Sequence, residues 1–343
     1  MLALNEQSLE ELKNTLEDMG QPSYRSKQIF DFFHKEGKTN IKDCTTLPKD
    51  LRKDLSKKDL CKIDIAHVFE SKKDPTKKFL FRLEDGHLIE GVLMQNNYGF
   101  SQCISTQVGC RMGCSFCAST QGGLVRNLSP YEMLGQVYQV SNRYGKIHSI
   151  ILMGSGEPLD NLDNVLRFLD LLNAERGYHM SYRNMTLSTC GLVPGILNLA
   201  KQNRKVNLAL SLHSPFQEVR EKMMPIAKRY KLNEVFKALD GYTENLGRRV
   251  SYEYTLIDGV NNRDQDVVKL KELLGHRLHH LNLIPLNPIK EYGKNRPQRD
   301  KIQDFKKRCE DIGLNVTIRR EQGGDIKASC GQLRQKFEEE ERV

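Results

Sequence analysis

Apolar residues recur along this chain with two periods, and the change of period divides it into regions. Ser8 and Glu11 have the spacing of a helix capping box, and the apolar residues that follow recur at helical spacing as far as Gly20. The same period predicts a second helix over 26–35. Basic residues become frequent after these helices, so we expect a small N-terminal helical module with a basic end.

The apolar period then changes to two. Residues 79–83 and 88–93 read as strands that flank Asp85-Gly86, a strong hairpin turn. Within the second strand, Glu90 shares a face with apolar neighbours. A carboxylate at such a position lies on an exposed face or is half-buried for a function, and apolar surroundings would raise the pKa of a carboxyl group.

From about residue 100, strands and amphipathic helices alternate, with helices for example at 163–173 and 264–275. The predicted strands are 102–107, 149–153, 184–188, 206–211, 250–256, 280–284 and 314–318. Repeated βα units predict a parallel sheet, either barrel-like or doubly wound. In such sheets function lies in the loops after the strands, which here are small and polar.

The overall composition narrows the class of protein. The chain has 343 residues and a net charge of +9, which fits a nucleic-acid partner, although a merely basic enzyme would have the same excess. The first residues lack the features of a signal peptide, and no apolar run approaches the ~20 residues that span a bilayer. We therefore expect a soluble cytoplasmic protein that does not bind a membrane. Candidate nucleic-acid contacts are Lys72-Lys73, Lys77-Lys78, Lys228-Arg229-Tyr230-Lys231, Arg248-Arg249 and Arg319-Arg320.

Three of the nine cysteines form a C-x3-C-x2-C cluster, at Cys110, Cys114 and Cys117. An odd number of cysteines in a reducing compartment argues against a disulfide framework. Zinc needs four ligands, and Cys103 could supply the fourth, so a non-catalytic RNA-binding protein with a structural zinc stays open. Alternatively, three thiolates on a [4Fe–4S] cluster leave one iron free to bind S-adenosylmethionine and generate a 5′-deoxyadenosyl radical. This spacing after the first strand of a βα series is the motif of radical S-adenosylmethionine enzymes.

Residues at the predicted strand ends are suited to hold that cofactor. The backbone around Gly156 can approach a ligand closely, and Glu157 can bind the ammonium group of S-adenosylmethionine. The other candidates offer hydroxyl, amide or loop positions for its ribose and carboxylate: Ser188, Ser211, Leu212, His213 and Asn287.

Several motifs together resemble the RlmN/Cfr family of RNA methyltransferases, and in detail the RlmN branch. They are Gln107-Val108-Gly109-Cys110 with the residues to Thr120, Gly156-Glu157-Pro158, Leu187-Ser188-Thr189, Ser211-Leu212-His213, Asn282-Leu283-Ile284-Pro285 and Ala328-Ser329-Cys330-Gly331-Gln332-Leu333. The resemblance implies an α/β fold, a partial (βα)6-type radical SAM barrel with an N-terminal helical module and a β-hairpin extension. The implied boundaries are 1–60 for an RNA-binding helical module, 61–95 for the hairpin lead-in, 96–326 for the core and 327–343 for a segment that carries a methylated cysteine.

The resemblance also implies a mechanism with two molecules of S-adenosylmethionine per turnover. The first methylates Cys330, and the second, at the cluster, yields the radical that removes a hydrogen from this methyl group. The methylene radical adds to C2 of an adenine, Glu90 takes the C2 proton, and Cys103 attacks Cys330 to form a disulfide and free the product. A low-potential electron donor such as a flavodoxin and a thiol reductant are implied as partners.

The substrates implied by the resemblance are an adenine of 23S rRNA and the adenine 3′ of a tRNA anticodon. Methylation at C8 of the rRNA adenine, the Cfr-type reaction, uses the same residues and stays open. The chain departs from the family pattern at Lys327, where a second acid is usual, and at Cys190 and Ala227. Lys327 puts the rate or the substrate preference in doubt, because it is close to Cys330 in sequence.

Overall fold

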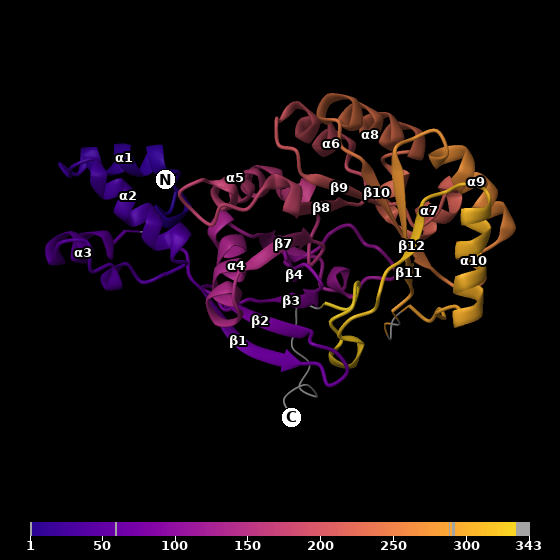
Figure 1. Ribbon diagram of the computed structural model, residues 1–343, viewed down its shortest axis with the longest axis horizontal. Coiled ribbons are helices and arrows are strands. Elements are labelled where there is room, and N and C mark those ends of the chain that lie inside the picture. Colours follow the sequence, from indigo (N-terminus) through magenta and orange to yellow (C-terminus); the bar gives the residue numbers. More distant parts are fainter. Residues whose placement is uncertain (1, 59, 288, 290–291, 334–343) are drawn as a thin grey trace.

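One large sheet organises the protein. The computed structural model describes residues 2–58, 60–287, 289 and 292–333. Ten strands pair in the order β1-β2-β3-β4-β7-β8-β9-β10-β11-β12 (Figure 1). Their bounds are β1 Ile63–Glu70, β2 Lys77–Leu83, β3 Leu88–Asn96, β4 Gly99–Cys103, β7 Ile147–Leu152, β8 Met185–Thr189, β9 Asn207–Ser211, β10 Val250–Leu256, β11 His279–Pro285 and β12 Val316–Ile318.

The sheet combines an antiparallel and a parallel half. Strands β1 to β4 pair antiparallel with one another, whereas β4, β7, β8, β9, β10 and β11 form six successive parallel strands and β12 adds a further one. Within the described residues, β1 and β12 are the two ends of the sheet. The predicted partial barrel with a hairpin extension is therefore confirmed.

One predicted strand, 102–107, is divided in the structure. Strand β4 ends at Cys103, and the chain then crosses the loop after β7, where the backbone N–H groups of Thr106 and Gln107 both donate to the Ser155 carbonyl. The next strand, β5 (Gln107–Gly109), leaves the main sheet and pairs antiparallel with β6 (Leu124–Asn127). This separate pair presents the segment that begins at Cys110.

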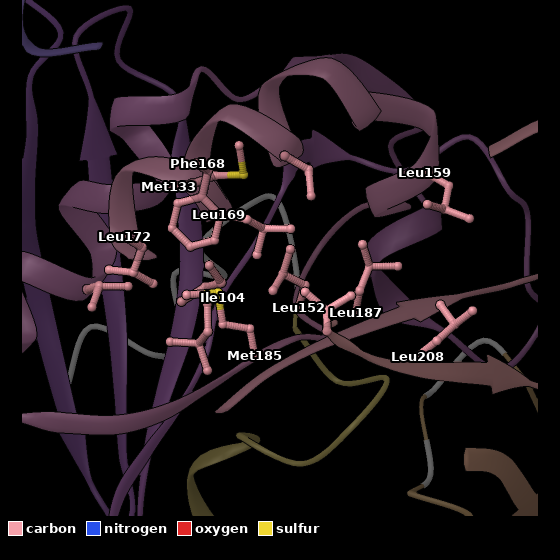
Figure 2. Packing of buried hydrophobic residues seen from close by; sticks show 14 of the residues in the cluster. Ile104, Met133, Leu152, Leu159, Phe168, Leu169, Leu172, Met185, Leu187 and Leu208 are labelled. Carbon is pink, nitrogen blue, oxygen red and sulfur yellow. The ribbon is translucent and has the colours of Figure 1, made fainter. Parts of the chain in front are cut away.

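Helices connect the parallel strands and cover the sheet. They are α4 Pro130–Tyr144, α5 Leu162–Asn173, α6 Val193–Lys201, α7 Gln217–Met223, α8 Leu232–Leu246, α9 Asp264–Leu274 and α10 Arg299–Asp311. Figure 2 shows Met133 and Phe168 from α4 and α5 packed against Leu152 and Leu187 from the strands. These side chains are almost fully buried, and the area that they remove from water stabilises the fold. None of the described helices has the length and apolar character to cross a membrane.

The N-terminal helices form a module at one side of the sheet (Figure 1). The predicted capping box of α1 (Leu9–Asp18) is present, with Ser8 and Glu11 bonded reciprocally. The second helix differs from its prediction, since α2 (Tyr24–Phe30) continues into a π-helical turn over Asp31–Lys35. A short α3 (Lys49–Leu55) follows. Glu11 binds Arg167 of α5 at 2.7 Å, which attaches the module to the core.

Candidate active site

The three clustered cysteines lie on the segment after β5, and each lines the same cavity. Backbone hydrogen bonds fix this segment at both ends: Cys110 N donates to the Gly123 carbonyl at 2.9 Å and Ser115 N donates to the Met223 carbonyl at 2.9 Å. Because Gly123 lies just before β6 and Met223 ends α7, the position of the cysteines depends on the assembled barrel.

The chemistry of these thiols fits an iron–sulfur cluster. Burial raises the pKa of Cys110 to about 12, and burial together with the neighbouring thiols raises that of Cys114. The raised pKa values favour the protonated thiols, and a bound cation would reverse this preference because it stabilises the thiolates. Across the described residues, no three Cys, His, Asp or Glu side chains close around a single ion. Soft thiolates are the ligands that iron–sulfur clusters take, so the three cysteines around this cavity would hold such a cluster.

Strand-end residues complete the wall of the cavity. The predicted cofactor residues that line it are Gly156, Glu157, Ser188, Ser211, His213 and Asn287. Leu212 is an exception, since its side chain is fully buried in the hydrophobic core and it supports the loop through its backbone, whose N–H donates to the Glu253 carbonyl. The wall thus combines hydroxyl and amide groups with apolar surface, which suits a polar nucleoside-containing ligand.

Glu157 is bonded within the protein. Its two carboxylate oxygens accept the backbone N–H groups of Leu159 at 3.1 Å and Cys190 at 2.8 Å. Burial raises the pKa of Glu157, and these two bonds oppose the rise. The carboxylate therefore joins the loops after β7 and β8, and its predicted contact with an ammonium group remains a prediction.

His213 is held as a neutral imidazole. Its Nδ1 accepts the backbone N–H of Thr255 at 3.0 Å, which places the ring proton on Nε2. Burial, with a contribution from Arg220, lowers the pKa of His213 to about 3. The ring meets Phe116 of the cysteine segment edge-on, with centroids 4.7 Å apart. His213 is therefore suited to shape the cavity and to offer an N–H rather than a charge.

The segment that carries Cys330 is bonded directly to the cysteine segment. Ala118 N donates to the Gly331 carbonyl at 2.8 Å, and the Ser119 hydroxyl donates to the Leu333 carbonyl at 2.8 Å. Asn287, predicted as a cofactor ligand, donates its side-chain amide to the Cys330 carbonyl at 3.1 Å. Cys330 consequently lines the same cavity as the three cluster cysteines.

Cys103 and Glu90 occupy one face of the antiparallel half of the sheet. Val92 of β3 pairs directly with Cys103 of β4, and Glu90 precedes Val92 by two residues, so all three side chains share that face. Cys103 packs there with Ala328 and Leu333 of the C-terminal segment. Burial raises the pKa of the Cys103 thiol to about 12, Cys330 adds to the rise, and the Arg319 guanidinium opposes it.

Two basic residues predicted as RNA contacts point inward instead. Lys78 has a side chain only 3% exposed, with its Nζ 3.0 Å from Oε1 of Glu90. The sequence predicted an apolar environment for Glu90, but the structure also places this lysine beside it. An opposite charge favours the ionised form of a carboxylate. Arg319 lines the cavity and lies 3.5 Å from Glu253. The alternation of strand 77–83 was the available signal for Lys78, since it places Lys78 and the partly exposed Lys77 on opposite faces of the strand.

Sequence reasoning also missed Arg220, which is fully buried. Its guanidinium donates to the carbonyls of Cys190, Ser211 and Leu212, and so ties the loops after β8 and β9 together. The one sign of Arg220 in the sequence was that a charged residue stands near apolar residues of the same helix.

The fold and the three-cysteine segment define a radical SAM enzyme. A model of the Radical SAM superfamily matches residues 104–271. A radical SAM methyltransferase from Sphaerobacter thermophilus superposes with a TM-score of 0.94 at 39% identity, covering 98% of this chain and all of the other. Membership of this superfamily implies a [4Fe–4S] cluster and S-adenosylmethionine as cofactors.

The chain as a whole belongs to the RlmN family of radical SAM RNA methyltransferases. The ribosomal RNA large subunit methyltransferase N-terminal domain matches residues 2–61. Probable dual-specificity RNA methyltransferases RlmN are similar over nearly full length. The protein from Lachnoclostridium phytofermentans is 48% identical over 96% of this chain and 93% of its own, and that from Desulforamulus reducens is 46% identical over 98% and 97%. The family resemblance seen in the sequence is thereby confirmed.

Proposed function

We propose that this enzyme methylates C2 of an adenine in 23S rRNA and of the adenine 3′ of a tRNA anticodon, with Cys330 as the carrier of the methyl group. The supporting observation is the position of the Cys330 segment. It is bonded to the cysteine segment through Ala118 and Ser119, and it packs through Ala328 and Leu333 against the strand face of Cys103. One thiol could then meet the radical source and the resolving nucleophile.

The proposed roles of the side chains follow from their chemistry. Cys110, Cys114 and Cys117 hold the cluster, which with two molecules of S-adenosylmethionine per turnover supplies a methyl group and a 5′-deoxyadenosyl radical. Glu90 accepts the proton from C2, the bonding electron pair stays on the adenine ring, and the oxidised cluster would take back the unpaired electron that the radical brought to the ring. Cys103 then attacks the sulfur of Cys330, so that an S–S bond forms while the bond from Cys330 to the product carbon breaks, and that carbon takes up a proton to complete the methyl group. A thiol reductant restores both thiols, and a low-potential donor such as a flavodoxin reduces the cluster.

The basic surface of the chain supports RNA as the substrate. The net charge of +9 and exposed pairs such as Lys72-Lys73 suit binding to phosphates, so affinity for a 23S rRNA fragment should fall steeply with salt. All nine cysteines are free thiols, which suits the reducing cytoplasm in which we place the enzyme.

Anaerobic reconstitution with 23S rRNA and with tRNA tests the proposal. Nucleoside mass spectrometry should show 2-methyladenosine at one adenine of each RNA. Methylation at C8 would replace the proposed regiochemistry by the Cfr-type reaction, and modification of rRNA alone would remove the tRNA activity. A protein that binds only zinc and forms no 5′-deoxyadenosine would overturn the radical mechanism.

A further inference from the structure

Lys78, which forms a buried pair with Glu90, lies in a row of register positions that runs across four strands. Phe69 of β1 is opposite Lys78 of β2, Lys78 is opposite Val92 of β3, and Val92 is opposite Cys103 of β4. Directly paired residues share a face of a sheet, so Lys78 projects from the face that carries Cys103. Glu90 lies one step along the same face, diagonal to Lys78.

The two charges are close and shielded from water. Nζ of Lys78 is 3.0 Å from Oε1 of Glu90, and the side chains are 3% and 7% exposed. The ammonium also lies over the Phe69 ring, 4.7 Å from its centroid. An ion pair in such a place costs desolvation of both charges, and replacing it with apolar residues is often no less stable. A buried pair beside reactive cysteines therefore suggests a role besides stability.

We propose that Lys78 is a positioning residue for the base Glu90, one that keeps its carboxylate ionised and directed along the Cys103 face. This inference rests on the proposed function of Glu90. Proton transfer requires an ionised acceptor at a fixed position, and the ammonium supplies both conditions while exchanging no proton itself. Among the described residues, Lys78 on β2 is the ion-pair partner of the carboxylate, Cys103 on β4 shares its face of the sheet, and the His67 ring on β1 lies tilted against Phe69 with centroids 4.4 Å apart.

The neighbouring lysine provides a matched control. Lys77 lies on the opposite face of β2, where its Nζ is 2.8 Å from Oε1 of Glu70 and the carboxylate partner is 60% exposed. Lys77→Met and Lys78→Met therefore remove the same charge from adjacent positions of one strand. Only the second substitution removes the charge beside Glu90.

The experiment measures methylated adenine formed per 5′-deoxyadenosine as a function of pH, in full-length reconstituted enzyme. We expect Lys78→Met to lower this ratio at neutral pH and to move its rising limb upward by about 1 to 3 pH units, the effect of losing an adjacent opposite charge. Lys78→Arg should keep the wild-type profile, and Glu90→Gln should recover at no pH. Lys77→Met removes a candidate RNA contact, so it is compared at saturating RNA, where the pH dependence of its ratio should follow that of the wild type.

The outcomes separate the inference from the function on which it rests. A wild-type enzyme that forms no 5′-deoxyadenosine would overturn the proposed function. A methylating wild-type enzyme with an unchanged ratio and profile in Lys78→Met would overturn the role of Lys78 alone.

A second measurement keeps Lys78 in place. Removal of this lysine would leave the Glu90 carboxylate as an uncompensated buried charge, which can impair folding. Infrared titration of the unloaded full chain, with Glu90→Gln as the reference that lacks the band, reports the ionisation of Glu90 directly. We expect a carboxylate throughout the neutral range. A band of the protonated acid at neutral pH would overturn the inference.

Discussion

The Ser71 hydroxyl donates to the Asp325 carboxylate at 2.7 Å and so joins the β1–β2 turn to the segment that carries Cys330. Lys72 N donates to the same carboxylate at 2.9 Å, and Asp74 accepts the backbone N–H of Gly323 at 3.0 Å. The hairpin extension therefore holds the start of the C-terminal segment, whereas Ala118, Ser119 and Asn287 hold its end. The position of Cys330 depends on contacts from both halves of the sheet.

Asp325→Ala should loosen this attachment. The hydrogen bonds from Ser71 and Lys72 hold the pKa of Asp325 below its ordinary value, so the contact is intact at neutral pH and weakens only in acid. We expect faster amide hydrogen exchange over 323–330 and a several-fold lower methylation rate. Glu84→Ala is the control, because Glu84 forms an exposed pair with Lys62 at the other end of β2. Equal exchange in both variants would contradict the role of this contact.

Resolution of the RNA adduct should depend strongly on pH. The pKa of Cys103 is raised to about 12, so its thiolate is scarce at neutral pH and increases about tenfold for each pH unit below that value. In single-turnover assays we expect the release of methylated RNA to accelerate from pH 7 to pH 9. Cys103→Ala should accumulate a covalent RNA–protein adduct, whereas Cys309→Ala, in the core on α10, should release product normally. Clean turnover by Cys103→Ala would exclude its proposed role.

Folding stability should decrease in mild acid through His34. This imidazole is fully buried, its Nδ1 lies 3.1 Å from the Tyr138 hydroxyl, and burial lowers its pKa to about 3 from an ordinary 6.5. The unfolded chain therefore binds this proton at a higher pH than the folded chain. The contribution to stability is complete above pH 6.5 and is lost as the pH falls toward 3. At pH 5 the loss in the free energy of unfolding is about 2 kcal/mol.

Urea unfolding of the unloaded chain at several pH values checks this expectation. His34→Gln can still bond to Tyr138 but carries no titrating group, so its free energy of unfolding should fall less between pH 6.5 and pH 5 than that of the wild type. His87→Gln is the control, since His87 is partly exposed near Asp85. Parallel curves for wild type and His34→Gln would show that another group causes the acid sensitivity.

The sequence predicted the parts of this enzyme that depend on local pattern. Alternation identified the hairpin around Asp85-Gly86, and cysteine spacing identified the cluster segment. Strand β1 was missed because most of its side chains are at least partly exposed and its ordering depends on pairing with β2. The pairing of Lys78 with Glu90 was missed for a related reason. Two adjacent lysines resemble a solvated surface, and only the register between β2 and β3 shows that one of them is buried.

The cofactor residues show the same difference between what local pattern predicts and what depends on the assembled fold. In the sequence these residues follow predicted parallel strands, and parallel strands end at the same edge of a sheet. In the structure six of them line one cavity. The partners of Asn287 and Leu212 could not be predicted, since the first bonds to a carbonyl 43 residues away and the second belongs to the core. Such contacts depend on tertiary closure rather than on periodicity.

Gly156 provides a test of close backbone packing in the cavity wall. Its φ is +111°, a conformation that side chains rarely adopt, and a Cβ there would lie 2.7 Å from Cβ of Gln107 and from Oγ1 of Thr106. Gly156→Ala should therefore combine backbone strain with a clash and cost about 3 kcal/mol of folding stability. The displaced loop should also weaken binding of S-adenosylmethionine to the reconstituted enzyme by at least tenfold in calorimetry.

Gly247 separates these two effects, because it also has a positive φ, +62°, but nothing lies within 4 Å of an added Cβ. Gly247→Ala should cost only the strain, about 1 kcal/mol, and should leave binding of S-adenosylmethionine unchanged. If both variants lost the same stability and neither lost affinity, the contact of Gly156 with Thr106 and Gln107 would have no part in shaping the cavity. A selective loss of affinity in Gly156→Ala would instead show that the cavity requires the loop after β7 to lie directly against the segment that leads from Cys103 to the cluster cysteines.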